Sequence, residues 1–277
     1  MRTLRTPPTK AVPIVIVSYN TLFHTRRCIE SILVHSHYPL SIPYRLIVVD
    51  NGSTDGTVEY LESLGDAVAW FTEKENLGWV KGVNNGLACA LYSGLDPDFI
   101  VFGNSDIVIP GEPWWLDRYI KPLEEEGIGA VGPTSNFVMG LQKYEFNAQM
   151  PPIHEVKYLI GLFVAMKAKV AREVSQLNFG NFLDERFGLG GNDDLDLSIR
   201  IRNLGYKLLV NRKAFVYHYG SRTLLQKDVF DGREGIAKEE ARTRALLVEK
   251  WGEKTVDELF IMPPGVQGRL GGAGEGI

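Results

Sequence analysis

Two groups of residues in this chain have types and spacings that could bind a metal ion. Asn104-Ser105-Asp106 directly follows the apolar run Phe99–Phe102. A carboxylate there can reach a divalent cation that bridges a diphosphate, because hard cations prefer oxygen ligands. His218 ends another short run, in VYHYGS, and one Asp and one His with two phosphate oxygens would complete a small, open metal site. Taken alone, such an Asp is more often a turn or cap residue and a single His is more often structural.

A third group could supply a base. The run Gly190-Gly191-Asn192-Asp193-Asp194-Leu195-Asp196 places three carboxylates in the first turn of a predicted helix, Asp193–Leu204. Compensation of the helix dipole, worth about 0.3–1 kcal/mol per charge, accounts for one or two acids. Three acids behind a Gly-Gly pair favour a further role. A carboxylate held near a metal-bound substrate can act as general base for an acceptor hydroxyl.

An anion site is predicted where Glu75–Trp79 leads into a helix. The helix, Val80–Leu91, carries Lys81, Asn84 and Asn85 near its start. A helix N-terminus with a nearby Lys suits a diphosphate, although a generic loop-to-helix junction shares much of this pattern. The sequence contains no Walker loop, GxGxxG, HExxH or GxSxG motif, which argues against kinases, dehydrogenases, proteases and esterases.

The elements that must position these residues alternate in the first half of the chain. Strands are predicted at Ile14–Val17, Leu46–Val49, Val68–Phe71 and Phe99–Phe102, and helices at Thr25–Leu33, Asp55–Leu64 and Val80–Leu91. Strands that are apolar on both faces and separated by helices predict a mostly parallel, Rossmann-like α/β sheet with helices on both faces. Sites in such sheets lie beyond the carboxyl ends of the strands. Ser18-Tyr19-Asn20, Asp50-Asn51-Gly52 and Asn104-Ser105-Asp106 should therefore meet at one edge.

The second half is less regular. It has a long loop at Pro133–Pro152, strands at Tyr158–Lys167, Tyr206–Val210 and Ala214–His218, and a helix at Lys238–Lys250. Loops of that length usually bind a ligand or form a lid over an active site. Both Pro133–Pro152 and Phe187–Gly191 are candidate lids over a bound ligand.

Composition and charge narrow the class of protein. The 277 residues carry a net charge of −4 and no basic stripe, so no nucleic-acid partner is expected. No apolar run approaches the ~18 residues of a membrane span, and the basic start lacks the apolar region of a signal peptide. Cys28 and Cys89 form no CxxC motif and are expected to be buried thiols in a reducing compartment. These features predict a cytoplasmic protein and leave open a peripheral contact at the inner face of the membrane.

Six segments in this order resemble glycosyltransferase family 2, the inverting transferases with the GT-A fold. They are PIVIVSYN, LIVVDNGSTDGTVEYL, ENLGWVKGVNNG, FIVFGNSDIVIP, FLDERFGLGGNDDLDLSIRIRNLGYKL and VYHYGS. The resemblance covers about Val12 to Thr223. VDNGSTDG and NLGW are closest in character to members that add rhamnose and related sugars to bacterial surface polysaccharides.

The resemblance implies a role for each matching residue. Tyr19 and Asp50 would contact the nucleotide base, and Lys81 would lie near the nucleotide or diphosphate. Asp106, in the place of the DXD motif, and His218 would hold Mn²⁺ or Mg²⁺. Asp194 is the first choice of base, with Asp193 the alternative. The residues expected to bind the nucleotide sugar are Ser18, Tyr19, Asn20, Asp50, Asn51, Gly78, Lys81, Asn84, Asn104, Ser105 and Asp106.

Two positions depart from the family pattern. Asn104 stands where the DXD motif begins with Asp, so the metal would rest on Asp106 and the diphosphate with little help from Asn104. Asp193-Asp194 replaces a Glu-Asp pair, and the shorter side chain requires a closer acceptor. Neither change removes the chemistry.

The sequence thus predicts an inverting, metal-dependent hexosyltransferase-type enzyme of polysaccharide or glycoconjugate synthesis. The donor would be a UDP-, GDP- or dTDP-sugar, and the acceptor a glycan, a lipid-linked glycan or a small molecule. Two alternatives remain: a sugar nucleotidyltransferase, and a degenerate nucleotide-sugar-binding domain without activity.

The expected organisation is a catalytic domain with short extensions. The predicted parts are a disordered arm at 1–11, one GT-A domain at 12–223, with its donor half at 12–110 and its acceptor half at 111–223, a helical extension at 224–262 and a disordered tail at 263–277.

Overall fold

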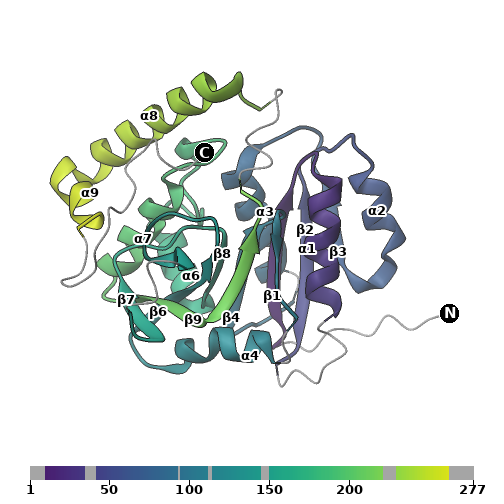
Figure 1. Cartoon of the computed structure of the whole chain (residues 1–277), viewed down its shortest axis with the longest axis horizontal. Helices are drawn as coiled ribbons and strands as arrows, with labels where there is room; N and C mark the ends of the chain where they lie inside the picture. The colour runs from purple at the N-terminus through teal and green to yellow at the C-terminus, as the bar shows by residue number, and fades with distance from the viewer. Residues whose placement is uncertain are drawn as a thin grey trace.

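The computed structural model describes residues 10–34, 42–92, 94–111, 114–144, 150–220 and 229–261. Apart from Lys10 and Ala11, the arm predicted at 1–11 lies outside these ranges, as does the tail predicted at 263–277. The described residues form a sheet of nine strands in the order β3-β2-β1-β4-β8-β6-β9-β5, with β7 paired to β9. Helices cover both faces of this sheet (Figure 1). The predicted α/β class is confirmed.

The bounds of the elements are as follows. The strands are β1 Val12–Ser18, β2 Tyr44–Asp50, β3 Ala69–Thr72, β4 Phe99–Asn104, β5 Ile107–Val108, β6 Ile128–Ser135, β7 Ile153–Val156, β8 Phe163–Lys167 and β9 Lys207–His218. The helices are α1 Leu22–Val34, α2 Thr57–Ser63, α3 Gly78–Tyr92, α4 Trp115–Ile120, α6 Ala168–Gln176, α7 Asp193–Asn203, α8 Gly232–Trp251 and α9 Glu253–Leu259. Short 3₁₀ turns include η3 Lys121–Glu124, η4 Gly140–Gln142 and η5 Glu185–Phe187.

The first four strands are parallel, as predicted. β1 lies between β2 and β4, and β3 adds to the far side of β2. In this register Ser18 is opposite Asp50, and Val17 is opposite Asn104. The polar clusters that follow these three strands therefore meet at one edge of the sheet, which confirms the expected convergence.

The second half mixes strand directions. β8 runs antiparallel to both β4 and β6, β9 runs parallel to β6, and β5 and β7 run antiparallel to β9. The two strands predicted between Tyr206 and His218 are one strand, β9, with a shift of register against Pro133 and Thr134 of β6. The predicted loop at Pro133–Pro152 begins inside β6 and contains η4, and its residues 145–149 lie outside the described ranges.

The strand predicted at Tyr158–Lys167 begins only at Phe163. Three backbone amides in the preceding segment donate to side chains instead of to a neighbouring strand. The Leu159 N–H donates to Ser198 Oγ (3.1 Å), the Ile160 N–H to Gln142 Oε1 (2.6 Å) and the Gly161 N–H to Asp194 Oδ2 (3.1 Å). An apolar run alone cannot reveal such partners, because they come from distant parts of the chain.

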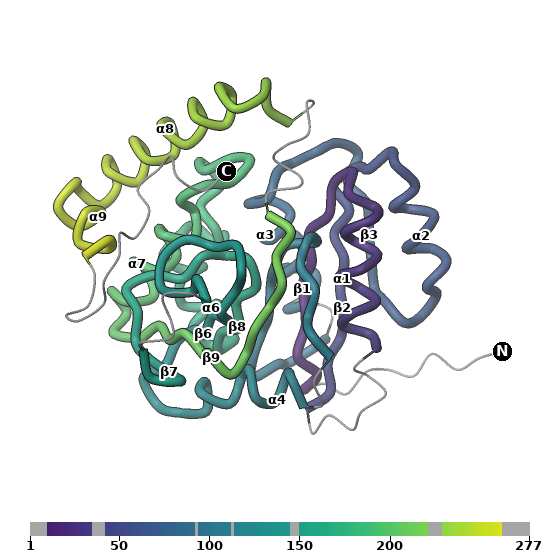
Figure 2. Tube along the Cα trace, viewed as in Figure 1, coloured from purple at the N-terminus to yellow at the C-terminus, as the bar shows by residue number. Residues whose placement is uncertain are grey.

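Alternate residues of β1 enter two separate cores. Val15 and Val17 pack in the core beneath α3, α6 and α7, whereas Ile14 and Ile16 pack in the core beneath α1, α2 and α4. Helices α8 and α9 lie on the α7 side (Figure 2) and add apolar side chains to the first core. This two-sided burial explains why the strand is apolar at every position.

Two further expectations can be compared with the structure. Among the described residues, no helix is both long and apolar enough to cross a bilayer. Cys28 is a buried free thiol, as expected, but Cys89 is exposed because it lies on the outer face of α3.

Close packing of α3 on the sheet yields a test of the fold. A Cβ added at Gly86 would lie 2.3 Å from Val15 Cγ1 and 2.9 Å from Val49 Cγ2. Gly→Ala in an exposed helix would stabilise by about 1 kcal/mol, but overpacking costs about 1–3 kcal/mol. We therefore expect Gly86→Ala to lower the free energy of unfolding, measured by urea titration. Ala88→Ser, at an exposed position of the same helix, should change it by less than about 0.5 kcal/mol, and a stabilised Gly86→Ala protein would contradict the packing.

Candidate functional site

The loops that follow β1 and β2 are tied to each other. Asn20, at a positive φ of 47°, accepts a hydrogen bond from the Thr54 N–H (2.7 Å), and its own N–H donates to Ser53 Oγ (2.8 Å). Ser18 is buried and its hydroxyl lies 2.7 Å from that of Thr25 in α1. Ser18 and Asn20, both predicted for the donor site, thus shape the edge through contacts within the chain. Tyr19 lies between them and is half-buried.

Asp50 is fully buried at the end of β2. Its Oδ2 accepts hydrogen bonds from the N–H groups of Gly52 (3.2 Å) and Ser53 (3.0 Å) and from Thr72 Oγ1 (2.8 Å). Its Oδ1 is buried and has no hydrogen-bond partner among the residues that the structure describes. A buried acceptor without a donor is costly unless a ligand satisfies it. The N–H group of a nucleotide base would do so.

Gly78 joins this edge to the acidic turn. Its carbonyl accepts from Asn51 Nδ2 (3.0 Å), and the next residue, Trp79, donates its N–H to Leu189 O (3.2 Å). A Cβ at Gly78, whose φ is +82°, would lie 2.8 Å from Leu189 Cα and 2.9 Å from Gly188 O. Only glycine allows this approach. The chain near residues 188–189 is therefore held against the start of α3.

The polar residues of α3 face different surroundings. Lys81 is half-exposed, with its Nζ 3.9 Å from Glu185 Oε2, and can reach an anion at the helix start. Asn84 is buried, and its amide binds the backbone of Leu183 through Oδ1 (2.7 Å) and Nδ2 (3.0 Å). The Asn84 side chain thus anchors the segment before α7 to α3.

The Asn104–Asp106 turn brings two predicted metal ligands together. β5 pairs antiparallel with β9 so that Ile107 is opposite His218, which sets the preceding carboxylate beside the ring. Asp106 Oδ1 lies 3.0 Å from His218 Nε2, and both side chains are about nine-tenths buried. Asn104 Nδ2 lies 3.4 Å from the same nitrogen. Ser105 is buried, with its hydroxyl 3.3 Å from that of Thr21.

The donor set fits a divalent cation. His218 Nδ1 lies 2.7 Å from the carbonyl oxygen of Phe137, a contact that fixes the ring with Nε2 turned toward Asp106. Metal-binding histidines commonly use their second nitrogen in this way. One carboxylate and one imidazole suit Mn²⁺ or Mg²⁺ when a diphosphate supplies further oxygens. Among the described residues no cluster of three or more His, Cys, Asp or Glu side chains has metal-binding geometry.

The acidic pair lies at the first turn of α7. Asp193 is buried, and its Oδ1 and Oδ2 accept from the Gly191 N–H (2.8 Å) and Trp79 Nε1 (3.1 Å). Asp194 is half-buried, and accepts from the N–H groups of Leu195 (2.8 Å) and Gly161 (3.1 Å). Burial raises the pKa of both carboxyls, and the neighbouring charge of Asp194 raises the pKa of Asp193 further. A raised pKa suits a carboxylate that must accept a proton near neutral pH.

Two residues without an assigned role in the sequence, Gly161 and Leu162, connect the acidic pair to the turn that carries Asp106. The Gly161 N–H donates to Asp194, and the carbonyl of Leu162 accepts from the Asn104 N–H (2.9 Å). Asp194 and Asn104 are thus bound to adjacent residues. Trp79 likewise links the start of α3 to Asp193. ENLGW was recognised as a motif, but no sequence signal indicated the indole contact.

Asp196, the third acid of the run, has a different role. It is fully buried and accepts from Lys250 Nζ (2.7 Å), Trp251 Nε1 (2.8 Å) and Arg200 Nε (2.9 Å). Its charge is balanced by two cations, Arg200 and Lys250, and its contacts with Lys250 and Trp251 anchor α8 to α7.

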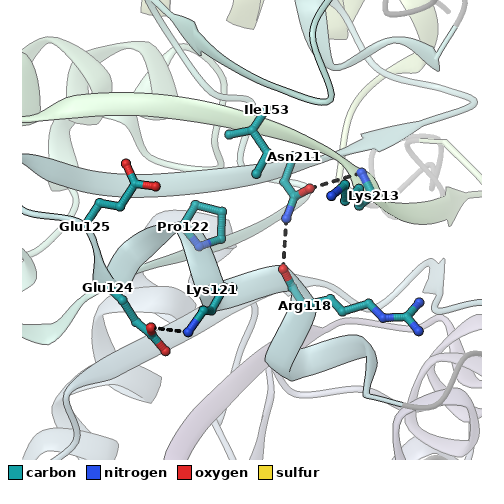
Figure 3. A pocket seen from close by; sticks show the side chains of 8 residues that line it. All are labelled: Arg118, Lys121, Pro122, Glu124, Glu125, Ile153, Asn211 and Lys213. Atoms are coloured by element: carbon teal, nitrogen blue, oxygen red, sulfur yellow. Dashed lines mark hydrogen bonds and ion pairs between the residues drawn. The ribbon is translucent and has the colours of Figure 1, made fainter.

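A pocket of about 370 Å³ between α4, η3 and β9 is separate from this site (Figure 3). Asn211 at its base donates to the carbonyl of Arg118 (3.0 Å) and accepts from the Lys213 N–H (3.0 Å). No residue predicted for the site lines it. Asn211 and His218 lie at distant points of β9, about 20 Å apart at ~3.3 Å per residue.

Comparison with known proteins gives one family. A sequence model of glycosyl transferase family 2 matches residues 14–172, a range that ends before the acidic pair and His218. An uncharacterized glycosyltransferase of Haemophilus influenzae is 30% identical over 125 residues, 44% of this chain and 35% of that protein. The uncharacterized glycosyltransferase YfnE of Bacillus subtilis is 27% identical over 179 residues, 64% of this chain and 43% of that protein. The chain thus matches less than half the length of either relative.

Three solved structures share the fold. The mannosyltransferase PcManGT of Pyrobaculum calidifontis with GDP-Man and Mn²⁺ has a TM-score of 0.59 and 19% identity, over 94% of this chain and 68% of that chain. GalNAc-T7 with UDP, GalNAc and Mn²⁺ has a TM-score of 0.63 and 14% identity, over 90% of this chain and 50% of that chain. S. aureus TarS with UDP-GlcNAc has a TM-score of 0.56 and 17% identity, over 86% of this chain and 71% of that chain. At these identities the similarity establishes the fold, and the predicted GT-A type is confirmed.

The raised pKa of Asp193 predicts a pH-dependent contribution to stability. A carboxyl with a raised pKa favours folding when protonated, so its contribution is full below the unfolded pKa and is lost as pH rises through the folded pKa. The Asp193→Asn side chain does not titrate, so the variant has no such pH-dependent contribution to lose. We expect the difference in unfolding free energy between variant and wild type to move in favour of the variant from about pH 4 to neutrality, by about 1.4 kcal/mol for each pH unit by which the pKa is raised.

Thermal and urea unfolding across this pH range measure that difference. The variant also loses a hydrogen bond at every pH, so the slope of the difference is the test and its offset is not. Asp66→Asn, at an exposed position, should give a flat difference. A flat difference for Asp193→Asn would show that burial does not raise this pKa.

Proposed function

Since this chain belongs to glycosyl transferase family 2, we propose that it transfers a sugar from a nucleotide-diphosphate donor to an acceptor hydroxyl, with inversion at the anomeric carbon. One observation carries the proposal. Adjacent residues, Gly161 and Leu162, bind Asp194 and Asn104, so a candidate base and the turn that carries Asp106 are held on either side of a single short segment.

Each part of the site has a place in this reaction. Asp50 would accept a hydrogen bond from the nucleotide base through its unsatisfied Oδ1, with Tyr19 and Asn51 at the same edge. Lys81 and the start of α3 would contact the diphosphate. Asp106 and His218 would hold Mn²⁺ or Mg²⁺, which when bound neutralises the leaving diphosphate.

Asp194 is proposed as the base in preference to Asp193. Each carboxylate accepts one N–H group on each oxygen, so hydrogen bonds do not separate them, but the Asp193 side chain is buried. Asp194 is more exposed, so an acceptor hydroxyl can approach it. Asp194 would take the acceptor proton as the hydroxyl attacks the anomeric carbon and the nucleoside diphosphate leaves. This direct displacement requires no enzyme nucleophile, in contrast to a retaining glycosidase.

The substrates are proposed at the level of chemical class. The donor is a UDP-, GDP- or dTDP-sugar, a choice supported by neighbours whose structures contain GDP-Man, UDP or UDP-GlcNAc. The acceptor is a glycan, a lipid-linked glycan or a small molecule of polysaccharide or glycoconjugate synthesis. We propose that the reaction occurs in the cytoplasm or at the inner face of the membrane.

The proposal is tested first by incubating the protein with UDP-, GDP- and dTDP-sugars, with and without Mn²⁺, and measuring the melting temperature. A donor at ~100 times its dissociation constant adds about 2.7 kcal/mol. We expect a metal-dependent shift of several degrees with one nucleotide class, followed by nucleoside diphosphate release with acceptor. The absence of both binding and release would favour a degenerate domain.

Asp194→Asn should separate chemistry from binding. A positioned general base contributes about 10²–10⁴-fold to a rate, so we expect kcat to fall by that amount while the donor dissociation constant changes less than about threefold. Asp66→Asn, at an exposed position in the turn that precedes β3 and so at the opposite end of that strand from the site, should keep the wild-type rate. Transfer at the wild-type rate by Asp194→Asn would exclude it as the base and direct the same test to Asp193.

Asp50→Asn should weaken donor binding. The amide oxygen can keep the contacts of Oδ2 while an NH₂ group replaces the unsatisfied Oδ1, so a base N–H would meet a donor in place of an acceptor. An unsatisfied buried group costs about 1–3 kcal/mol, which corresponds to a roughly 5- to 150-fold rise in the dissociation constant. Calorimetric titration with the free nucleoside diphosphate measures it, and unchanged affinity would remove Asp50 from the donor site.

A further inference from the structure

We propose that α8 positions the acidic pair, acting through Arg242 and Thr243 on the segment 186–192. This inference rests on the proposed function because it assigns positioning residues to the same reaction. Helix α8 covers Gly232–Trp251 and lies beyond residues 14–172, which the family model matches.

The segment before the acidic pair has a backbone that needs external support. Gly188, Gly190, Gly191 and Asn192 all have positive φ, of 64°, 121°, 103° and 61°. Glycine reaches these values without clash but is also the residue with most freedom to leave them. Asn192 holds a conformation that costs non-glycine residues about 1 kcal/mol or more. Contacts from outside the segment must therefore stabilise this backbone conformation over the others that the glycines allow.

Arg242 supplies two of these contacts. Its Nη1 donates to the carbonyl of Arg186 (3.0 Å) and its Nη2 to that of Phe187 (3.1 Å). The guanidinium is held in place by Glu239, which accepts from Nε (2.8 Å) and Nη2 (2.7 Å). A planar group fixed on one edge by a carboxylate thus presents its other edge to two successive carbonyls, which an ammonium cannot reproduce.

Thr243 supplies the next contact along the segment. Its buried hydroxyl accepts from Asn192 Nδ2 (2.9 Å) and donates within its own helix to Glu239 O (3.0 Å). A Cβ added at Gly191 would lie 3.4 Å from Thr243 Oγ1, so backbone and helix are in close approach there. Asn192 directly precedes Asp193, and the Gly191 N–H donates to Asp193.

A second anchor fixes α8 to the far side of the same turn. Lys250 bridges Asp196 (2.7 Å) and Asp184 (2.8 Å), and Trp251 donates to Asp196 (2.8 Å). Positions 239, 242, 243 and 250 fall on one stripe of a helix with 3.6 residues per turn. Helix α8 therefore makes polar contacts with the chain on both sides of the acidic pair, at residues 186–192 and at Asp196.

These contacts favour positioning over packing alone. Leu247 is buried in the first core and attaches the helix to the protein by apolar packing. The polar contacts instead reach the carbonyls and side chain of the segment that sets the direction of Asp193 and Asp194. A displacement of about 1 Å in a reacting group can reduce a rate by about 100-fold.

The test compares Arg242→Ala with Arg244→Ala, two residues apart on α8. Arg244 contacts Asp257 (3.3 Å) in α9 and not the segment, so its variant serves as the matched control. For Arg242→Ala we expect faster amide hydrogen exchange at residues 187–193, a 10- to 100-fold lower kcat and a donor dissociation constant within about threefold of wild type. Arg242→Lys should fail to restore kcat, and Arg244→Ala should show neither effect.

A second variant guards against general unfolding. Thr243→Val keeps the side-chain shape, loses the bond to Asn192, and should produce the same two changes in milder form with a cooperative unfolding transition. Unchanged exchange at residues 187–193 in both variants, or unchanged kcat despite faster exchange, would overturn the inference. Hydrogen exchange needs no substrate. A wild-type protein without transferase activity would therefore refute the proposed function, while the exchange data would still test whether α8 holds the segment 186–192.

Discussion

The site depends on the backbone of Gly161 and Leu162 more than on any one side chain. One N–H from this segment reaches Asp194 and one carbonyl receives the Asn104 N–H. Close packing against β4 leaves this segment little freedom, because a Cβ at Gly103 would lie 2.8 Å from Leu162 O. Adjacent backbone groups have a fixed spacing. The two halves of the site are therefore linked by one covalent step along the chain with a single hydrogen bond at each end.

Hydrogen bonds and opposite charges also explain how carboxylates are accommodated inside the protein. An ionised carboxyl loses its water on burial, and only hydrogen bonds or opposite charges can compensate. Asp50 and Asp193 are stabilised by N–H and O–H donors, and Asp106 by the His218 ring. Asn104 fits this pattern, because an amide beside Asp106 adds no second negative charge. The departure from an Asp at that position thus suits a turn with one carboxylate and one imidazole.

Sequence patterns predicted the first half of the fold well. Strands buried on both faces and separated by helices have few alternatives, and the ends of three such strands located Ser18, Asp50 and Asn104 correctly. The second half was predicted less well because its contacts depend on distant partners. Leu159 to Gly161 carry the apolar character of a strand but donate their amides to side chains. Likewise, nothing local indicates that Asn84 binds Leu183 or that α8 reaches residues 186–192.

The run Asp193-Asp194-Leu195-Asp196 shows why residue type alone could not assign the base. Its three acids have the same chemistry and nearly the same place in the sequence. Asp196 meets Lys250 and Arg200, so its charge is neutralised within the protein. Asp193 and Asp194 each accept an N–H group on both oxygens, but Asp193 is buried. Asp194 alone combines a raised pKa with access from outside. Environment separates otherwise equal acids. Two cations neutralise Asp196, and exposure separates Asp194 from the buried Asp193, which leaves Asp194 able to take a proton from an approaching hydroxyl.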